Sequence, residues 1–561
     1  MSELTQVLRF SPRTIEDEMR IYRAKPIAWT DSSVALLNEY GATLCTPDRE
    51  ATPLDLPEAD EIVLSPDGVM YACWFENESF RVQAYRLEAE AFKPAGQPCV
   101  VNVHSLHGED LVVLGIPGGV ELWLDTAEQC QRIWTISNGG ARRNPATVDP
   151  RPRGELLFSS GTVAGFVEDL GVQGTFLNVV DMASSATWRV RAAFAFAALG
   201  RVLAISSNDP TDEDGLHGLH VFANGQATFL ESDGPVIEAG GDSTRVVMSV
   251  FTGSDTQLRE ITEDGVGDLV VHHVDTLSGY KALSLDGSLY TVRGFTDTLT
   301  VASVPRRNRV LRSPRPVITG LTFPSPHGEY VVSRAPERAT GAVIHFHGGP
   351  ESYEVPEGRF FGLPQWCNAH GLDWIGVNYQ GSLMPDRLYT RSAWHRWRSA
   401  IQEDFLGAVE LTSGPLVLAG WSFGATLALT LGASTERTKG LLLGAPTGNL
   451  AKHVEHAVTI DPGHLDWFAR RFDLEGDDAK FFSGMNGFNA DLQVLEIHGE
   501  NDINCPAYLA NEVAERWKEQ GNPWERVWLP GRGHYASIPE DVELISESAR
   551  NFLTRVLLEK A

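Results

Sequence analysis

The 561-residue sequence lacks the features that mark membrane-spanning proteins. No run of about 18 apolar residues occurs, and the first residues do not form a basic segment followed by an apolar one. We therefore expect a cytoplasmic protein with no cleaved signal and no membrane partner.

Basic residues are in short supply. Lys and Arg number 46 against 74 Asp and Glu, which gives a net charge of -28. A polyphosphate-binding surface would have to form against the field of the protein itself. The composition therefore argues against a nucleic-acid partner.

Cysteine is scarce and never occurs in a CxxC pair. This spacing speaks against a metal cluster or a disulfide framework, so we expect free and mostly buried thiols, and neither a metal nor another cofactor. The six cysteines are Cys45, Cys73, Cys99, Cys130, Cys367 and Cys505.

The first 310 residues contain a series of short apolar runs separated by Gly, Asp, Ser and Pro. This pattern is typical of an all-β domain. Tight polar turns recur at intervals of 36, 40, 46, 46, 43 and 44 residues. One four-stranded propeller blade takes about 40 to 50 residues, so the rhythm predicts a seven-bladed β-propeller. A pair of β-sandwiches stays open, because the turns recur without repeated residue identity. The turns lie at Ser32, Gly68, Gly108, Gly154, Gly200, Ser243 and Gly287.

Three segments follow from these patterns. Ser11 can cap a helix that opens at Pro12, so we expect residues 1–26 to hold a helix and lead-in that pack on the C-terminal domain. Residues 27–310 would form the propeller. Strands alternate with helices over residues 311–561, which predicts a mostly parallel, doubly wound α/β sheet.

A G-x-S-x-G sequence marks the C-terminal segment. Residues 415–419 read as an apolar strand, Gly420–Gly424 as a sharp turn, and the residues after it as a helix. This is the context of a nucleophile elbow, in which Ser422 is exposed at the end of a strand. A side chain at Gly420 or Gly424 would strike the neighbouring strand or helix, so both positions require glycine. The alternative, a merely structural Gly-Ser turn, does not account for the strand and helix on either side.

A serine nucleophile needs a base, and the base needs an orienting carboxylate. Asp502 and His534 each follow a predicted strand, in the order Ser, acid, His that this fold class uses. An earlier strand ends in a glycine-rich loop, 347–350, whose amides can bind an oxyanion together with the N–H of Phe423.

Other residues compete for these roles. Glu500 is an alternative acid to Asp502, while we interpret His498 and His347 as local hydrogen-bonding residues.

Two further groups could suggest other sites. His453 and His456 have a spacing that could suit a metal, but no third ligand is evident, which favours an exposed helix face. Tryptophans and arginines over residues 391–398 could suggest nucleic-acid stacking, although in so acidic a chain a helix packed on the sheet is the better account. The members of this second group are Trp394, Trp397, Arg391, Arg396 and Arg398.

These motifs resemble the prolyl oligopeptidase family of serine peptidases, and most of all its acylaminoacyl-peptidase branch. The resemblance covers nearly the whole chain and implies an α/β-hydrolase domain behind a seven-bladed β-propeller. It implies Ser422 as nucleophile, Asp502 and His534 as its partners, and the amides of Gly349 and Phe423 as the oxyanion hole. The sequence motifs that support this resemblance are His347-Gly348-Gly349-Pro350, Asn378-Tyr379-Gln380-Gly381-Ser382, Gly420-Trp421-Ser422-Phe423-Gly424, His498-Gly499-Glu500-Asn501-Asp502 with Pro506, and Gly533-His534. In that family the propeller covers the active site, so short peptides or small amides are the implied substrates.

The chain departs from the family at positions outside the triad. Asn504 stands where the family often has an arginine that contacts a substrate carbonyl, and Gln380 replaces the arginine of N-Y-R-G-S. Leu383-Met384-Pro385 replaces the usual G-Y-G, and Ala425 replaces a second glycine after the elbow. No Glu-Glu pair, which anchors the substrate amine in the dipeptidyl-peptidase branch, occurs in the sequence. The departures indicate altered substrate recognition rather than altered bond cleavage.

Three functions remain open at this stage. The first is a peptidase or amidase on short or N-blocked peptides. The second is an esterase, or a specialised hydrolase or acyl-transferring cyclase on a modified peptide or small metabolite. The third is a propeller binding module with a vestigial hydrolase domain. The sequence leaves the oligomeric state open, a homo-oligomer included.

Overall fold

The computed structural model describes most of the chain. The described residues are 7–10, 25–29, 34–38, 41–45, 52–65, 69–76, 78–88, 91–103, 111–116, 118–126, 128–137, 140–149, 151–160, 163–170, 174–198, 201–206, 217–223, 226–241, 246–251, 256–262, 265–271, 281–283, 289–293, 299–303, 320–324, 329–354, 359–384, 386–483, 492–535 and 539–559.

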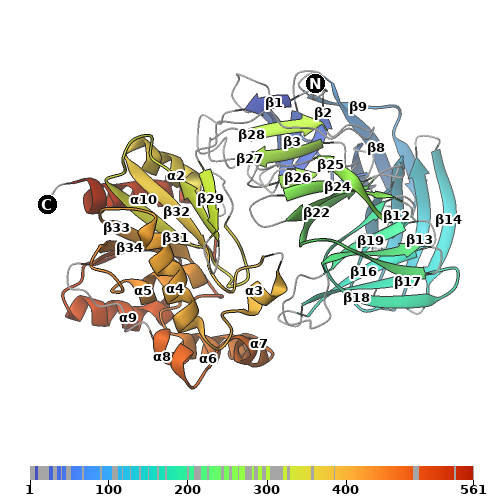
Figure 1. Ribbon diagram of the computed structural model, residues 1–561. Coiled ribbons are helices and arrows are strands. Elements are labelled where there is room, and N and C mark those ends of the chain that lie inside the picture. The colour runs from blue at the N-terminus through green and yellow to red at the C-terminus, as the bar shows by residue number, and fades with distance from the viewer. Residues whose placement is uncertain are drawn as a thin grey trace. The chain divides into compact units, whose positions relative to one another are not determined.

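The chain divides into two compact units (Figure 1). Unit 1 comprises residues 1–292 and 298–314, and unit 2 comprises residues 293–297 and 315–561. The main division lies close to the boundary expected near residue 310. Near the N-terminus, where we expected a helix packed on the C-terminal domain, strand β1 (Val7–Phe10) pairs with β28 (Leu299–Ser303) of unit 1. The helix expected from Ser11 lies outside the described residues.

Unit 1 consists of antiparallel sheets in which strands adjacent in sequence mostly pair with one another. The first three sheets contain β2 (Lys25–Trp29), β3 (Val34–Asn38), β4 (Gly41–Cys45) and β5 (Thr52–Leu54); β6 (Glu61–Leu64), β7 (Met70–Glu76), β8 (Ser79–Glu88), β9 (Ala91–Pro94) and β10 (Cys99–Asn102); and β11 (Leu111–Ile116), β12 (Gly119–Asp125), β13 (Cys130–Ser137) and β14 (Gly140–Val148).

The next sheet joins seven strands in sequence order: β15 (Glu155–Ser160), β16 (Val163–Asp169), β17 (Thr175–Asp181), β18 (Ala186–Ala198), β19 (Arg201–Ser206), β20 (Gly218–Ala223) and β21 (Gln226–Glu231). The last two contain β22 (Val236–Gly241), β23 (Val246–Phe251), β24 (Thr256–Thr262) and β25 (Gly265–Val271); and β1, β28, β27 (Leu289–Arg293) and β26 (Lys281–Leu283).

Strand β18 is long enough to belong to two groups of strands. Residues 186–191 pair with β17, and residues from Ala192 onward pair with β19. Of the seven turns in the predicted rhythm, Gly154 is described, and it leads into β15 with φ +101°, a conformation that favours glycine. The other six turns lie outside the described residues.

The cores of unit 1 lie between consecutive sheets. Phe80 and Val82 of the second sheet pack in one cluster with Val120 and Leu122 of the third. A second cluster joins Trp123 of the third sheet to strands β15–β17. In these two places, consecutive sheets therefore bury apolar residues against one another.

Unit 2 is built on one eight-stranded sheet. Its order is β29 (Gly320–Pro324), β30 (Glu329–Ser333), β32 (Leu372–Asn378), β31 (Gly341–Phe346), β33 (Leu416–Trp421), β34 (Thr438–Gly444), β35 (Gln493–Gly499) and β36 (Trp524–Leu529). The strands from β32 to β36 run parallel, and β29 and β30 add an antiparallel edge. The expected mostly parallel α/β sheet is confirmed.

The helices of unit 2 alternate with these strands. They are α2 (Arg359–Ala369), α3 (Arg387–Arg391), α4 (Trp397–Glu410), α5 (Phe423–Leu431), α6 (Leu450–Ile460), α7 (His464–Arg471), α8 (Asp477–Phe481), α9 (Ala507–Glu519) and α10 (Pro539–Leu553), followed by a π-helical turn, η3 (Thr554–Leu558).

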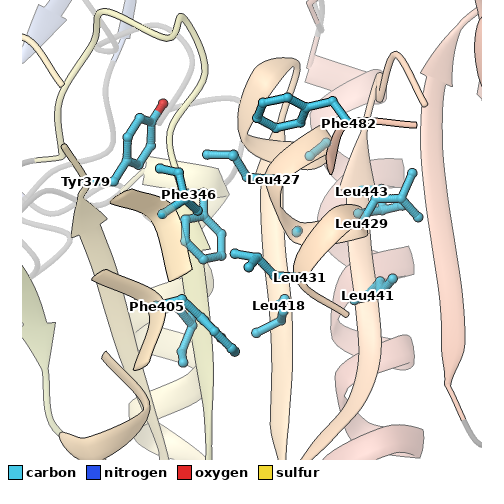
Figure 2. Close-up of a cluster of buried hydrophobic side chains, with 14 of the residues drawn as sticks. Phe346, Tyr379, Phe405, Leu418, Leu427, Leu429, Leu431, Leu441, Leu443 and Phe482 are labelled. Atoms are coloured by element: carbon cyan, nitrogen blue, oxygen red, sulfur yellow. The ribbon is translucent and has the colours of Figure 1, made fainter. Parts of the chain in front are cut away.

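The sheet carries a hydrophobic core on each face, because its central strands are mostly apolar and successive side chains point to opposite sides. Ile344 and Leu418 pack with α4, α5 and α9 in the core of Figure 2. Val343 and Val417 pack with α2 and α10 on the other face. The sheet is thus covered by helices on both sides, the doubly wound arrangement expected.

The order β32-β31-β33 places the carboxyl ends of β31 and β33 side by side. Crevices at this kind of switch point, beyond the carboxyl ends of parallel strands, hold the ligands of open α/β sheets. The loops that follow β31, β33, β35 and β36 all open on the same edge.

Cysteine burial agrees largely with expectation. Cys73, Cys130, Cys367 and Cys505 are free and buried, and Cys99 is free and half-buried. In the part of the chain that the structure describes, no helix combines the length and apolarity needed to span a bilayer.

Candidate active site

Ser422 occupies the sharp turn between β33 and α5. Its backbone lies at φ 58° and ψ -123°, a strained conformation for a residue with a side chain. The Ser422 N–H donates to the carbonyl of Gly444 at 2.7 Å, which helps to hold the turn.

The glycines around this turn are required by space. A Cβ at Gly420 would lie 2.4 Å from the carbonyl carbon of Gly424, and a Cβ at Gly424 would lie 2.0 Å from the carbonyl oxygen of Phe346. The steric reason expected for both glycines is confirmed. The strand and helix can approach closely only because neither position carries a side chain.

Asp502 and His534 come from the loops after β35 and β36. His534 Nδ1 and Asp502 Oδ2 are 2.7 Å apart, and Oδ1 of Asp502 accepts the N–H groups of Asn504 and Cys505, both at 2.9 Å. Burial alone would raise the pKa of Asp502, but the bonds from His534 and Cys505 outweigh it and hold the pKa below its usual value. Asp502 is therefore an ionised acceptor that orients the His534 ring.

Backbone packing fixes the histidine loop against the other two. A Cβ at Gly499 would lie 1.9 Å from the carbonyl oxygen of Gly533, so the acid loop and the histidine loop are in direct contact. Trp421 Nε1 donates to the carbonyl of His534 at 2.9 Å, which joins the histidine loop to the serine turn. The three residues are thus held at one edge by neighbouring strands.

The hydroxyl of Ser422 has a thiol as its neighbour: Oγ lies 3.8 Å from Sγ of Cys505. Over the described residues, this hydroxyl is not hydrogen-bonded to His534. Because Nδ1 of His534 is engaged by Asp502, Nε2 is the ring nitrogen left for a proton from serine. Such contacts are often long without substrate and shorten when it binds.

The loop after β31 lies beside the serine. A Cβ at Gly348 would lie 3.5 Å from Cβ of Ser422, and Gly349 has φ +127°, which strongly favours glycine. His347 Nε2 and Ser382 Oγ are 2.7 Å apart, and the ring stacks on Tyr379 with centroids 4.2 Å apart. These contacts fix the loop close to the first turn of α5, where amides lack partners within the helix.

The ring of Phe423, directly after the serine, belongs to an aromatic cluster. It lies 5.2 Å from Trp397 and 5.6 Å from Phe482, measured between ring centroids, and further contacts involve Tyr379 and Phe472. This packing anchors the start of α5 and gives the site an apolar, aromatic flank.

Glu500, His453 and His456 form their hydrogen bonds with groups other than the three central side chains. Glu500 is exposed, and its carboxylate accepts the N–H of Gly531 at 3.0 Å rather than facing His534. His453 and His456 lie on α6, where each Nε2 donates to a backbone carbonyl, of Asn504 at 3.1 Å and of Ile503 at 2.8 Å. They brace the loop that carries Asp502.

Of the tryptophan and arginine group, Trp397 packs within unit 2, whereas Arg396 and Arg398 are exposed. Trp397 is fully buried, and its Nε1 donates to the carbonyl of Arg471 at 2.8 Å. The guanidinium of Arg471 lies over Trp394 and Trp467, 5.1 and 4.1 Å from the ring centroids. The interpretation as a helix packed on the sheet is confirmed for Trp397.

Sequence reasoning did not place Cys505, Glu496 or the bonds of His498 at the site. Their closeness to Asp502 in the sequence could have identified them, since Cys505 follows Asp502 by three residues and Glu496 and His498 lie on the strand that leads to Asp502.

Residues 359–560 match the model of the prolyl oligopeptidase family. No curated protein sequence matches the chain significantly.

Solved structures of similar fold span nearly the whole chain. An acylaminoacyl peptidase from Pyrococcus horikoshii has a TM-score of 0.65 at 12% identity, over 97% of this chain and 98% of that one. A puromycin-hydrolyzing peptidase from Mycobacterium tuberculosis has a TM-score of 0.59 at 17% identity, over 99% and 97%. A puromycin hydrolase has a TM-score of 0.60 at 18% identity, over 98% and 97%. At such identities the similarity establishes the fold.

Proposed function

Because residues 359–560 belong to the prolyl oligopeptidase family, we propose that the protein is a serine hydrolase that cleaves amide bonds of short or N-blocked peptides. The observation that carries the proposal is the 2.7 Å contact between His534 and the ionised Asp502 on loops fixed against the serine turn. A histidine oriented in this way is the partner that a serine nucleophile needs.

The proposed reaction has two halves. Ser422 Oγ attacks the substrate carbonyl carbon while Nε2 of His534 takes the hydroxyl proton, and Asp502 stabilises the resulting imidazolium. The amides of Gly349 and Phe423 bind the negative oxygen. The carbon–nitrogen bond then breaks, and Nε2 returns the proton to the leaving amine. Water attacks the acyl-serine by the same route and releases the acid.

We further propose that unit 1 is a seven-bladed propeller that limits access to the site. The seven-stranded sheet counts as two four-stranded blades that share β18, which makes seven blades with the other five sheets. Cores shared between consecutive sheets agree with blades packed face to face. The role in access rests on the family resemblance.

Replacement of the nucleophile tests the mechanism. Ser422→Ala should lower kcat/KM on N-acetylated peptide anilides by about 10³ or more, because no other group can form the acyl-enzyme. A fluorophosphonate probe should label Ser422 in the folded wild-type protein, as read by peptide mass spectrometry. Ser434→Ala, which removes an exposed hydroxyl beyond the far end of α5, is the matched control and should keep full activity. Near-full turnover by Ser422→Ala would contradict the proposal.

One observation favours a second substrate class. Asn504 stands at the position of the family's substrate-binding arginine, and its backbone is held by His453 and Asp502. An esterase, or an acyl-transferring enzyme on a modified peptide, would tolerate the loss of that arginine. Comparison of peptide anilides with p-nitrophenyl esters separates the classes, since turnover confined to esters would exclude the peptidase.

A further inference from the structure

Two neighbouring residues at the end of α7, Arg471 and Phe472, contact the segments that carry the two proposed oxyanion amides. Arg471 Nε donates to Oε1 of Glu351 at 2.7 Å, and Glu351 follows Gly349 by two residues. The ring of Phe472 lies 5.8 Å from the ring of Phe423, measured between centroids. The proposed reaction uses the two amides but gives Arg471 and Phe472 no part.

The guanidinium of Arg471 is buried and held in one orientation. The side chain is 2% exposed, and its Nη1 donates to the carbonyl of Trp467 at 3.1 Å. The group also lies over the rings of Trp394 and Trp467. Because arginine stays charged and its planar fork donates in fixed directions, Nε is a rigid donor toward Glu351.

The backbone of Arg471 leads to the other amide. Its carbonyl accepts Nε1 of Trp397 at 2.8 Å and the N–H of His395 at 3.1 Å. The ring of Trp397 stacks on Phe472 at 5.3 Å and meets Phe423 edge-on at 5.2 Å, measured between centroids. One pair of residues is thus joined to the loop after β31 by a side chain and to the first turn of α5 by aromatic packing.

We propose that Arg471 and Phe472 are positioning residues that set the separation between the amides of Gly349 and Phe423. The inference rests on the proposed function, because that function assigns the two amides to the oxyanion. Oxyanion donors are effective when they already point to the place where negative charge develops. The two amides belong to a loop and a helix that are distant in sequence, so a third segment that contacts both limits their relative shift.

Displacement of one amide should affect the transition state more than substrate binding. Loss of one oxyanion donor lowers kcat by about 10² to 10³, so a small displacement should lower kcat by about tenfold and leave KM nearly unchanged. A thionoester reports on this geometry, because its sulfur is larger than oxygen and a weaker hydrogen-bond acceptor. Well-placed amides therefore favour the oxygen ester over the thionoester.

The experiment measures p-nitrophenyl acetate and the matching thionoester with the full-length protein. The quantity compared is the ratio of kcat/KM for the oxygen ester to kcat/KM for the thionoester, after the turnover by Ser422→Ala is subtracted from each rate. Arg471→Lys keeps the charge but loses the rigid fork, and should lower the ratio by about tenfold. Glu351→Gln keeps an acceptor oxygen but loses the charge that strengthens the bond, and should lower the ratio by about threefold.

Two further variants complete the set. Phe472→Leu removes the ring that packs on Phe423 and should also lower the ratio by about threefold. Arg470→Gln is the matched control, because Arg470 is the exposed neighbour of Arg471 and pairs with Asp466 at 2.8 Å; its ratio should equal that of the wild type. Thermal unfolding shows which variants are folded, and Glu351→Gln, which nearly preserves shape, gives an answer even if Arg471→Lys does not fold.

The possible results separate the two proposals. A merely structural role would lower the rates for both esters equally, and a ratio within about twofold of the wild type in the folded variants would overturn the inference alone. If the wild type hydrolyses neither ester, the proposed function fails and the inference fails with it.

Discussion

At the scale of single residues, the site brings two nucleophilic side chains together. Sγ of Cys505 lies 3.8 Å from Oγ of Ser422. Burial, followed by the charge of Asp502, raises the pKa of this thiol to about 12. The thiolate is the reactive form of cysteine, so at neutral pH Cys505 acts as a buried packing group rather than as a nucleophile.

Cys505→Ala tests this assignment. Because the thiol is a weak hydrogen-bond donor, its loss should change kcat/KM by about threefold or less. Iodoacetamide at pH 8 should leave Cys505 of the folded wild type unmodified, as read by peptide mass spectrometry. A loss of activity comparable with that of Ser422→Ala would instead assign the nucleophile to the thiol.

Some residues of the site could be identified from the sequence immediately around them, and others could not. Ser422, Asp502 and His534 could be selected from the sequence because each directly follows an apolar strand, within a short motif. The contact between Cys505 and Ser422 joins positions 83 residues apart, and Glu496, the partner of His498, is held by Trp524 and Arg526 of the neighbouring strand. Such contacts depend on tertiary packing, which no local pattern encodes.

At the scale of elements, Asp404 joins α4 to the end of β32. It is 1% exposed, and its Oδ2 accepts the N–H of Gln380 at 2.7 Å. Burial raises the pKa of Asp404 to about 7. Gln380 stands where the resembled family has arginine, and Arg396 donates to its Oε1. The family's positive charge at that position is therefore missing.

This carboxyl should make stability depend on pH. Well below pH 4 it is protonated in both the folded and the unfolded chain. As pH rises to about 7, the unfolded chain releases the proton while the folded chain retains it, so Asp404 destabilises the fold progressively. Above that range both forms are ionised and the effect is complete.

Asp404→Asn should remove this dependence. Relative to wild type, the variant should gain stability as pH rises from 4 to 7, by on the order of 3 kcal/mol in total. Thermal unfolding of both proteins across that range measures the difference, with Glu410→Gln, at the exposed end of α4, as control. A difference that stays constant with pH would contradict the assigned pKa.

Helices and strands could be predicted from the sequence where their apolar residues follow one regular pattern. Strand β33 of unit 2 is continuously apolar, and the order of strand, turn and helix around Ser422 follows from residues 415–431. In unit 1 the turns suggested separate blades, whereas β18 runs for 13 residues through two sets of strand partners. No sequence pattern indicates that the first part of β18 pairs with β17 and the second part with β19.

At the scale of the molecule, the proposed role of unit 1 predicts selection by size. Peptides of a few residues should be cleaved, and extended peptides of about 30 residues and folded proteins should not, because a propeller would exclude them. Cleavage of a length series built around one scissile sequence, read by mass spectrometry, measures the limit. Equal kcat/KM along the series would show that unit 1 does not restrict access.

The pairing of β1 with β28 has a consequence for synthesis. The register joins Val7 to Ala302 and Phe10 to Leu299, so the first strand has no partner until about 300 residues have left the ribosome. The central strands of unit 2 find their neighbours over much shorter distances along the chain. Strand β1 therefore stays unpaired with β28 until most of unit 1 has been translated. In proteins truncated before residue 299, β1 would lack this partner and would be open to pairing with other chains.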